Sequence, residues 1–210
     1  MTFRHLPTRR GLTFLEFLLA LTITAMITAA ISVMVSAVSV GETSRRDNRG
    51  YIVRTYSSKS RLSAYFARCR AVLAVDGSDA VVWLNDWRGG DTVHATEIRW
   101  FIFDNLTNSI KVYYVDFPDT WTAVAQALED LEYSSGQDWS AVLNTYMAAG
   151  HVSSMTVVDG VENVQITTDQ PAAIDSIVIS FDLQFEMASS GEPVQQVITM
   201  RILRHEAPIL

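Results

Sequence analysis

Cysteine is almost absent from this chain, since Cys69 is the only one among its 210 residues. A single cysteine excludes an intrachain disulfide, and it excludes zinc sites that are built on paired cysteines. Nothing in the surrounding sequence marks Cys69 as an activated nucleophile. We therefore expect a packed thiol rather than a reactive one.

Proline is absent between Pro7 and Pro118. Because proline breaks helices, its absence allows one long helix to occupy much of this stretch. Apolar residues recur near helical spacing from Tyr51 to Leu73, and basic residues fill much of the remaining circumference. The sequence predicts a helix from Leu12 to about Leu73, with residues 41–75 as its amphipathic continuation.

Glycine is rare in the same stretch, where only Gly41 and Gly50 interrupt the predicted helix. Each weakens a helix by up to about 1 kcal/mol relative to alanine. We expect any bend or break of the helix at these two positions.

Charge is almost absent from residues 12–40. This segment of 29 residues holds 21 apolar residues, seven Ser or Thr, and one ionisable side chain, Glu16. About 20 apolar residues cross a bilayer as a helix, so the segment is predicted to be transmembrane. A carboxylate inside such a segment costs roughly 2.5–3.5 kcal/mol, less near the interface, and normally has a partner. Glu16 is therefore a candidate functional residue.

Basic residues are scarce in the second part of the chain. Residues 1–70 contain eleven Lys or Arg against three acids, a charge of +8, whereas residues 71–210 contain five against twenty, a charge of −15. Such asymmetry is typical either of a surface interaction or of a solvated helix followed by an acidic soluble domain. The folded part has no basic patch in its sequence, so we expect no nucleic-acid partner.

After residue 75 the helical spacing gives way to short runs rich in β-branched and aromatic residues. Polar turns separate these runs, as in an antiparallel meander. One run alternates strictly, with Ile179, Phe181 and Leu183 on one face and Ser180 and Asp182 on the other. The predicted strands of this domain, residues 76–210, are 80–85, 96–104, 109–117, 154–158, 161–168, 176–187 and 194–204.

A small helical insert is predicted at about residues 119–149, between the two sets of strands. Its helices are expected at Trp121–Tyr133 and Trp139–Met147. Its acids are expected on a solvated face rather than in a metal site: Glu129, Asp130, Glu132 and Asp138.

No catalytic motif is present in the sequence. The histidines are scattered, and there is no His-Glu-x-x-His pattern, nucleophile elbow or glycine-rich phosphate loop. We predict that the protein is not an enzyme and that it needs no cofactor. The candidate ligands for calcium would be four acids: Asp76, Asp79, Asp86 and Asp91. Their spacing does not match an EF-hand, and we interpret them as residues that form turns.

The start of the apolar segment carries a specific motif. Arg9-Arg10 precede Gly11, and Leu12-Thr13-Phe14-Leu15-Glu16 opens the apolar run. This junction resembles the class III prepilin leader of type IV pilins and type II secretion pseudopilins. The resemblance implies that a prepilin peptidase cuts between Gly11 and Leu12 and methylates Leu12, and that Glu16 is the assembly residue. The family usually begins its mature chain with Phe, so Leu12 departs from the pattern.

The resemblance also implies a pilin-like α+β fold, in which a long N-terminal helix, first transmembrane and then amphipathic, packs on an antiparallel β-sheet. The pattern of the last three predicted strands is similar to that of the C-terminal strands in a minor pseudopilin of the J type. The K type usually lacks the acid that Glu16 provides here. The chain would be a minor structural subunit of a type II secretion pseudopilus or a type IV pilus, at its tip. Residues 1–11 would be the leader peptide and residues 12–40 the transmembrane helix.

The partners that the resemblance implies are other pilins or pseudopilins, the prepilin peptidase, an inner-membrane assembly platform and the lipid bilayer. The implied location is the inner membrane, with a cytoplasmic N-terminus and a periplasmic C-terminal domain. Counting basic residues does not set this orientation, because three arginines lie close to each end of the apolar segment. The leader resemblance sets it.

Two other classes of protein stay open. Thr8-Arg9-Arg10-Gly11-Leu12 partly resembles a twin-arginine export signal, but the run after it is more hydrophobic than such signals and leaves Glu16 without a role. The main alternative is a signal-anchored, periplasm-facing enzyme or binding protein of the cell envelope, since distant residues can form a site in space.

Overall fold

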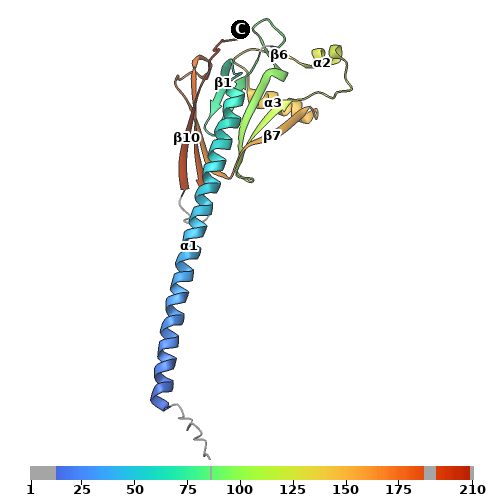
Figure 1. The fold of residues 1–210 in the computed structure, drawn as a ribbon. Coiled ribbons are helices and arrows are strands. Elements are labelled where there is room, and N and C mark those ends of the chain that lie inside the picture. The colour runs from blue at the N-terminus through green and yellow to red at the C-terminus, as the bar shows by residue number, and fades with distance from the viewer. Residues whose placement is uncertain (1–12, 86, 187–192, 209–210) are drawn as a thin grey trace, which may run out of the picture. The chain divides into compact units, whose positions relative to one another are not determined.

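The computed structural model describes residues 13–85, 87–186 and 193–208, with the backbone alone for residues 43–48. The chain divides into two compact units, residues 1–46 and 47–210, which we describe separately. The described part is α+β, with one long N-terminal helix and antiparallel sheets (Figure 1). The predicted fold class is confirmed at this level.

The long helix, α1, covers Phe14–Phe66 and continues through Gly41 and Gly50 without a break. Its continuation to residue 75 was predicted wrongly, because β1 (Ala71–Asp76) follows after a short turn. In β1, Ala71 and Leu73 belong to one apolar cluster and Val72 to the other, which is the alternation of a strand. The apolar residues 71–73 fit the spacing of a helix as well as that of a strand, and hydrogen-bonded pairing with β2 makes them a strand.

All three sheets of the second unit are antiparallel. The largest contains β1, β2 (Asp79–Trp83), β4 (Ile98–Asp104), β5 (Ser109–Val115) and β7 (Val152–Asp159), in that order. The second contains β10 (Pro193–Arg201), β9 (Val178–Glu186) and β8 (Val161–Thr168), and a two-stranded sheet joins β3 (Val93–His94) to β6 (Glu132–Tyr133). Short 3-10 turns lie at Ala95–Glu97 and Ala173–Asp175.

Each predicted strand corresponds to an observed strand, with ends that differ by a few residues. β9 shows the predicted alternation, since Ile179, Phe181 and Leu183 are fully buried, whereas Ile177, at the start of the predicted strand, is exposed. β9 and β10 are antiparallel neighbours. β1, β3 and β6 were not predicted.

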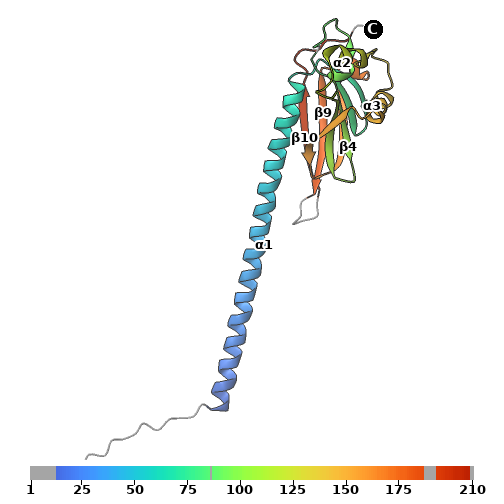
Figure 2. The same ribbon diagram turned by 90° about the vertical axis from the view of Figure 1, so that its right-hand side faces the viewer.

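Two apolar clusters lie on opposite sides of the five-stranded sheet. The first joins the last turns of α1 to the inner faces of both larger sheets, through Leu62 and Phe66. Phe66 contacts Phe101 of β4 and Phe181 of β9, with ring centroids 5.5 and 5.7 Å apart. Figure 2 shows β10, β9 and β4 between this part of α1 and the insert helix α3.

The helical insert contains α2 (Ala123–Glu129) and α3 (Trp139–Ala148), which confirms both predicted helices. α2 ends before the predicted Tyr133, because Glu132 and Tyr133 form β6. α3 forms much of the second apolar cluster, together with Trp83 and Trp100 of the sheet. The insert therefore covers the face of the five-stranded sheet opposite α1.

The prediction of a solvated acidic face on the insert is wrong for Asp130. This residue is 3% exposed, and its carboxylate accepts hydrogen bonds from Arg88 Nε at 3.0 Å and from Thr96 N and Oγ1 at 2.9 and 2.7 Å. A buried carboxylate needs such partners, since desolvation without them costs several kcal/mol. The other three acids are exposed, and Asp138 caps α3.

Cys69 is a packed thiol, as predicted. It is 1% exposed within the first apolar cluster, and its Sγ contacts the carbonyl of Ala71 at 3.4 Å. Burial raises the pKa of Cys69 to about 12, so the reactive thiolate is scarce at neutral pH.

Replacing Phe66 tests whether the end of α1 is part of the domain core. We expect Phe66→Ala to lower the free energy of unfolding by about 3–5 kcal/mol, because it leaves a cavity between β4 and β9. Denaturant unfolding of the full chain in a nonionic detergent, followed by tryptophan fluorescence, measures this. Tyr56→Ala is the control, since Tyr56 is 69% exposed on the same helix and should cost about 0.5 kcal/mol or less. Equal losses in the two variants would contradict this core.

Candidate functional site: the start of the apolar helix

The first part of α1 is an apolar segment with no covering inside its own unit. Phe14–Glu42 is long and apolar enough to cross a membrane, and it is the only such helix in the part of the chain that the structure describes. None of its most hydrophobic window is buried, and large side chains such as Phe14 and Met26 are more than 70% exposed. An exposed apolar surface of this length is typical of a segment that contacts lipid or another protein.

Glu16 has a partner in its own chain. Its Oε2 accepts hydrogen bonds from the backbone N–H of Thr13 at 2.9 Å and from the Thr13 hydroxyl at 3.0 Å. The Glu16 N–H in turn donates to Thr13 Oγ1 at 3.4 Å. This reciprocal arrangement is a capping box, which satisfies backbone donors that have no partner within the first helical turn.

The capping box explains why α1 begins at Phe14 and why an acid is tolerated near its start. An acid in the first turn is also favoured by the positive end of the helix dipole. Both bonds go to one carboxylate oxygen, and no residue among those described donates to Oε1. Glu16 is therefore partly satisfied by neutral donors, and its Oε1 has no donor among the described residues.

Thr13 is the residue that the sequence analysis missed. The signal was present as the spacing Thr13-x-x-Glu16 before an apolar run, which is the usual signature of a capping box.

Most hydroxyl groups further along the apolar segment are satisfied by the helix itself. Thr24 and Thr28 donate to the carbonyls four residues before them, each at 2.8 Å. Thr22, Ser32 and Ser39 make similar bonds to carbonyls three or four residues earlier. Polar groups that bond within the helix cost little in lipid, so the Ser and Thr content of this segment is compatible with a membrane.

The predicted processing residues Gly11 and Leu12 lie outside the described residues, as do Arg9 and Arg10. Thr13, the residue directly after Leu12, is the described residue that contacts Glu16. Glu16 is the one predicted site residue whose geometry is described.

The aspartates considered for calcium do not form a ligand cluster in the described structure. No group of three or more His, Cys, Asp or Glu side chains able to hold a metal occurs among the described residues, and Asp86 lies outside them. Asp79 accepts from Phe103 N at 3.0 Å, and Asp91 lies 3.5 Å from Arg70. Each of these two carboxylates therefore has a partner within the fold. Asp79 is bound by a backbone N–H of β4, and Asp91 by the guanidinium of Arg70.

Comparison with protein-family models, curated proteins and solved structures finds no match to this chain.

Removing the Thr13 hydroxyl tests the capping box. We expect Thr13→Ala to speed hydrogen–deuterium exchange of the Glu16 amide by about fivefold, because capping groups contribute roughly 1 kcal/mol. Exchange is measured on the full chain in nonionic detergent micelles. Thr22→Ala removes a hydroxyl that bonds only to the Leu19 carbonyl and should leave the Glu16 amide unchanged. The same exchange rate in both variants would argue against the capping box.

Proposed function

We propose that this chain is a minor pilin-like structural subunit rather than an enzyme. It is cleaved between Gly11 and Leu12, methylated at Leu12 by prepilin peptidase, and assembled into a type II secretion pseudopilus or a type IV pilus, at the tip. The observation that carries the proposal is Glu16 at the start of an exposed apolar helix, four residues after the proposed new amino terminus. Its Oε1 accepts no hydrogen bond from the described residues.

The charge of Glu16 supplies the physical reason for assembly. Thr13 donates two hydrogen bonds but no positive charge, so an ionised Glu16 carboxylate would still lack a cationic partner in a membrane. Cleavage at Leu12 creates an amino group at the membrane face. A staggered neighbour in a filament presents this amine to Glu16 Oε1, and the pair is far more favourable in a low dielectric than either charge alone. A subunit in the wrong register leaves both charges unpaired.

The exposed apolar segment is the packing surface of the proposed filament. Before assembly, lipid covers side chains such as Phe14 and Met26, and in the filament the helices of neighbouring subunits replace the lipid. Ala25 and Ala29 are spaced four residues apart on one helix face and permit close approach of a second helix. The assembly platform of the inner membrane would transfer the subunit from one environment to the other.

The proposed topology places residues 1–11 in the cytoplasm and the folded domain in the periplasm. The role of a filament subunit is supported by the way in which α1 is anchored in the domain, because the end of α1 is buried in the core through Leu62 and Phe66. Force applied to the helix in a filament is therefore carried directly into both larger sheets. A minor pseudopilin of the J type is the subunit that we propose.

Processing is tested by the mass of the mature N-terminus. We expect mass spectrometry of protein extracted from host membranes to find a chain that begins at methylated Leu12. Gly11→Ala should accumulate the full-length precursor, whereas a substitution outside the junction, such as Thr22→Ala, should be processed normally. A chain that still begins at Met1 in cells with an active prepilin peptidase would refute the processing.

Assembly is tested by separating the charge of Glu16 from its cap. Glu16→Gln keeps an oxygen that accepts from Thr13 and removes the charge, whereas Thr13→Ala weakens the cap and keeps the charge. We expect Glu16→Gln to reduce cross-linking to neighbouring pilins by about tenfold or more, with membrane insertion unchanged. Thr13→Ala should retain most of the cross-linking. Equal effects of the two substitutions would mean that Glu16 acts only as a helix cap.

A further inference from the structure

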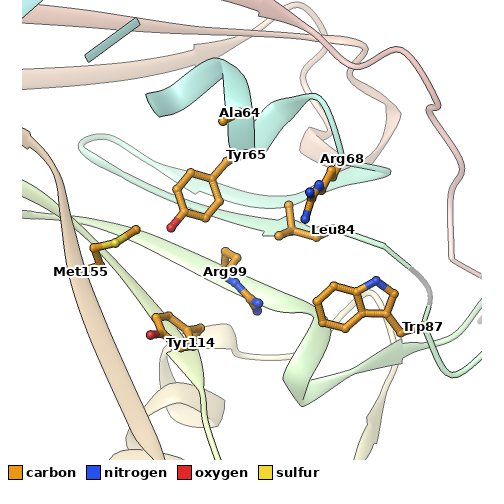
Figure 3. Close-up of a pocket in the computed structure, with 8 residues that line it drawn as sticks. All are labelled: Ala64, Tyr65, Arg68, Leu84, Trp87, Arg99, Tyr114 and Met155. Carbon is orange, nitrogen blue, oxygen red and sulfur yellow. The ribbon is translucent and has the colours of Figure 1, made fainter. Parts of the chain in front are cut away.

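A cavity of about 350 Å³ opens in the second unit, beside the end of α1. It is lined by aromatic, cationic and aliphatic side chains, among them Tyr65, Arg68, Leu84, Trp87, Arg99 and Tyr114. Figure 3 shows Arg99 near the centre of this group, with Tyr65 and Arg68 on the α1 side and Tyr114 and Trp87 across from them. Its volume is within the range of sites that bind small organic ligands.

Arg99 supplies a positive charge to the cavity, and no acid among the described residues forms an ion pair with it. It is partly buried, its Nη1 donates to the carbonyls of Thr96 and Ile98 at 2.8 and 2.7 Å, and its guanidinium lies 5.1 Å from the Tyr114 ring centroid. Carbonyls and rings satisfy hydrogens without cancelling the charge. Burial lowers the pKa of Arg99, although an arginine stays protonated at neutral pH.

Arg68 adds a second guanidinium from the turn that follows α1, and it is exposed. Among the described residues, no carboxylate forms an ion pair with Arg68 or Arg99. Asp116 exerts a longer-range attraction on Arg99, but it is exposed and its Oδ2 accepts from the Ser153 hydroxyl at 2.8 Å. Two cations thus share one cavity in a domain whose net charge is strongly negative, and a local anion site is the simplest use of them.

Trp87 completes the wall of the cavity, and its backbone is held in place by the buried carboxylate of Glu97. Its side chain is 61% exposed, whereas its backbone N–H donates to Glu97 Oε1 at 2.6 Å. Glu97 is 1% exposed, and it also accepts from Arg88 N at 3.1 Å and from Trp83 Nε1 at 3.0 Å. A buried carboxylate therefore fixes the segment that carries an exposed indole, so a ligand binding there does not have to order that segment.

We propose that this cavity binds an organic carboxylate with an aromatic body. The guanidiniums match a carboxylate because each presents paired donors in a plane. The rings of Tyr65, Trp87 and Tyr114 provide stacking surfaces for the body, and Leu84 and Met155 add apolar wall. Inorganic phosphate has no apolar body to cover these walls. The carboxylate belongs either to a free small acid or to an acidic side chain beside an aromatic residue in a peptide.

The test is a titration of the full chain in nonionic detergent by isothermal calorimetry, with N-acetylphenylalanine as the free acid. A blocked peptide with adjacent Glu and Phe is the second probe, and N-acetylphenylalanine amide is the uncharged control. We expect saturable binding of at least one carboxylate probe, binding of the amide that is at least about tenfold weaker, and competition between the two acids where both bind. The tighter acid identifies the source of the carboxylate.

Substitutions locate the site. Arg68→Gln and Arg99→Gln should each weaken binding by about tenfold, and Trp87→Ala should weaken it by several fold. Arg201→Gln makes the same change of charge on exposed β10, outside the cavity, and should leave binding unchanged. Because Arg68 is exposed, its substitution tests the site even if Arg99→Gln fails to fold.

Three results would overturn the proposal. They are no saturable binding of either acid, equal binding of the acid and its amide, or affinities that stay within twofold of the unmodified chain in both Arg68→Gln and Arg99→Gln. Inorganic phosphate that binds more tightly than both acids would also overturn the assignment to carboxylates. None of these measurements depends on cleavage at Gly11 or on filament assembly, so the cavity and the proposed function stand or fall separately.

Discussion

The packing of the last turns of α1 against both larger sheets is the interaction on which the folded domain depends. Leu62 and Phe66 lie in a cluster that receives side chains from every strand of the two larger sheets. Phe66 lies between Phe101 and Phe181, one from each sheet. Without this contact each sheet would expose an apolar face to water, since the helix and the two sheets share one core.

Two buried carboxylates organise the opposite side of the five-stranded sheet. Glu97 accepts from the backbone of Trp87, Arg88 and His94, and Asp130 ties the insert to Thr96 and Arg88. Because each acid loses its hydration, it is stable only while these donors stay in place. The irregular segment between β2 and β4 is thus held by polar contacts, and this rigidity gives the neighbouring cavity its fixed wall.

Glu16 illustrates how one residue serves two physical purposes. As the third residue of α1 it completes a capping box with Thr13, which favours a helix start at that position. The cap provides only neutral donors, so it leaves the carboxylate without a cation among the described residues. In the proposed filament, the same side chain would both cap its own helix and pair with the charged amine of a neighbour.

The sequence by itself determined the elements whose patterns are long or have only one interpretation. The apolar run of 29 residues, in which Glu16 is the one ionisable side chain, indicated a helix, and the strict alternation of β9 placed Phe181 and Leu183 inside. The tertiary structure alone decided the end of α1 at Phe66, because Ala71 to Leu73 fit a helix or a strand until β2 pairs with them. It alone brought Arg68, Trp87 and Arg99 to one cavity and buried Asp130, since such contacts join residues far apart in the chain. Local periodicity records which side of an element is apolar, but it carries no information about the partner which that side meets.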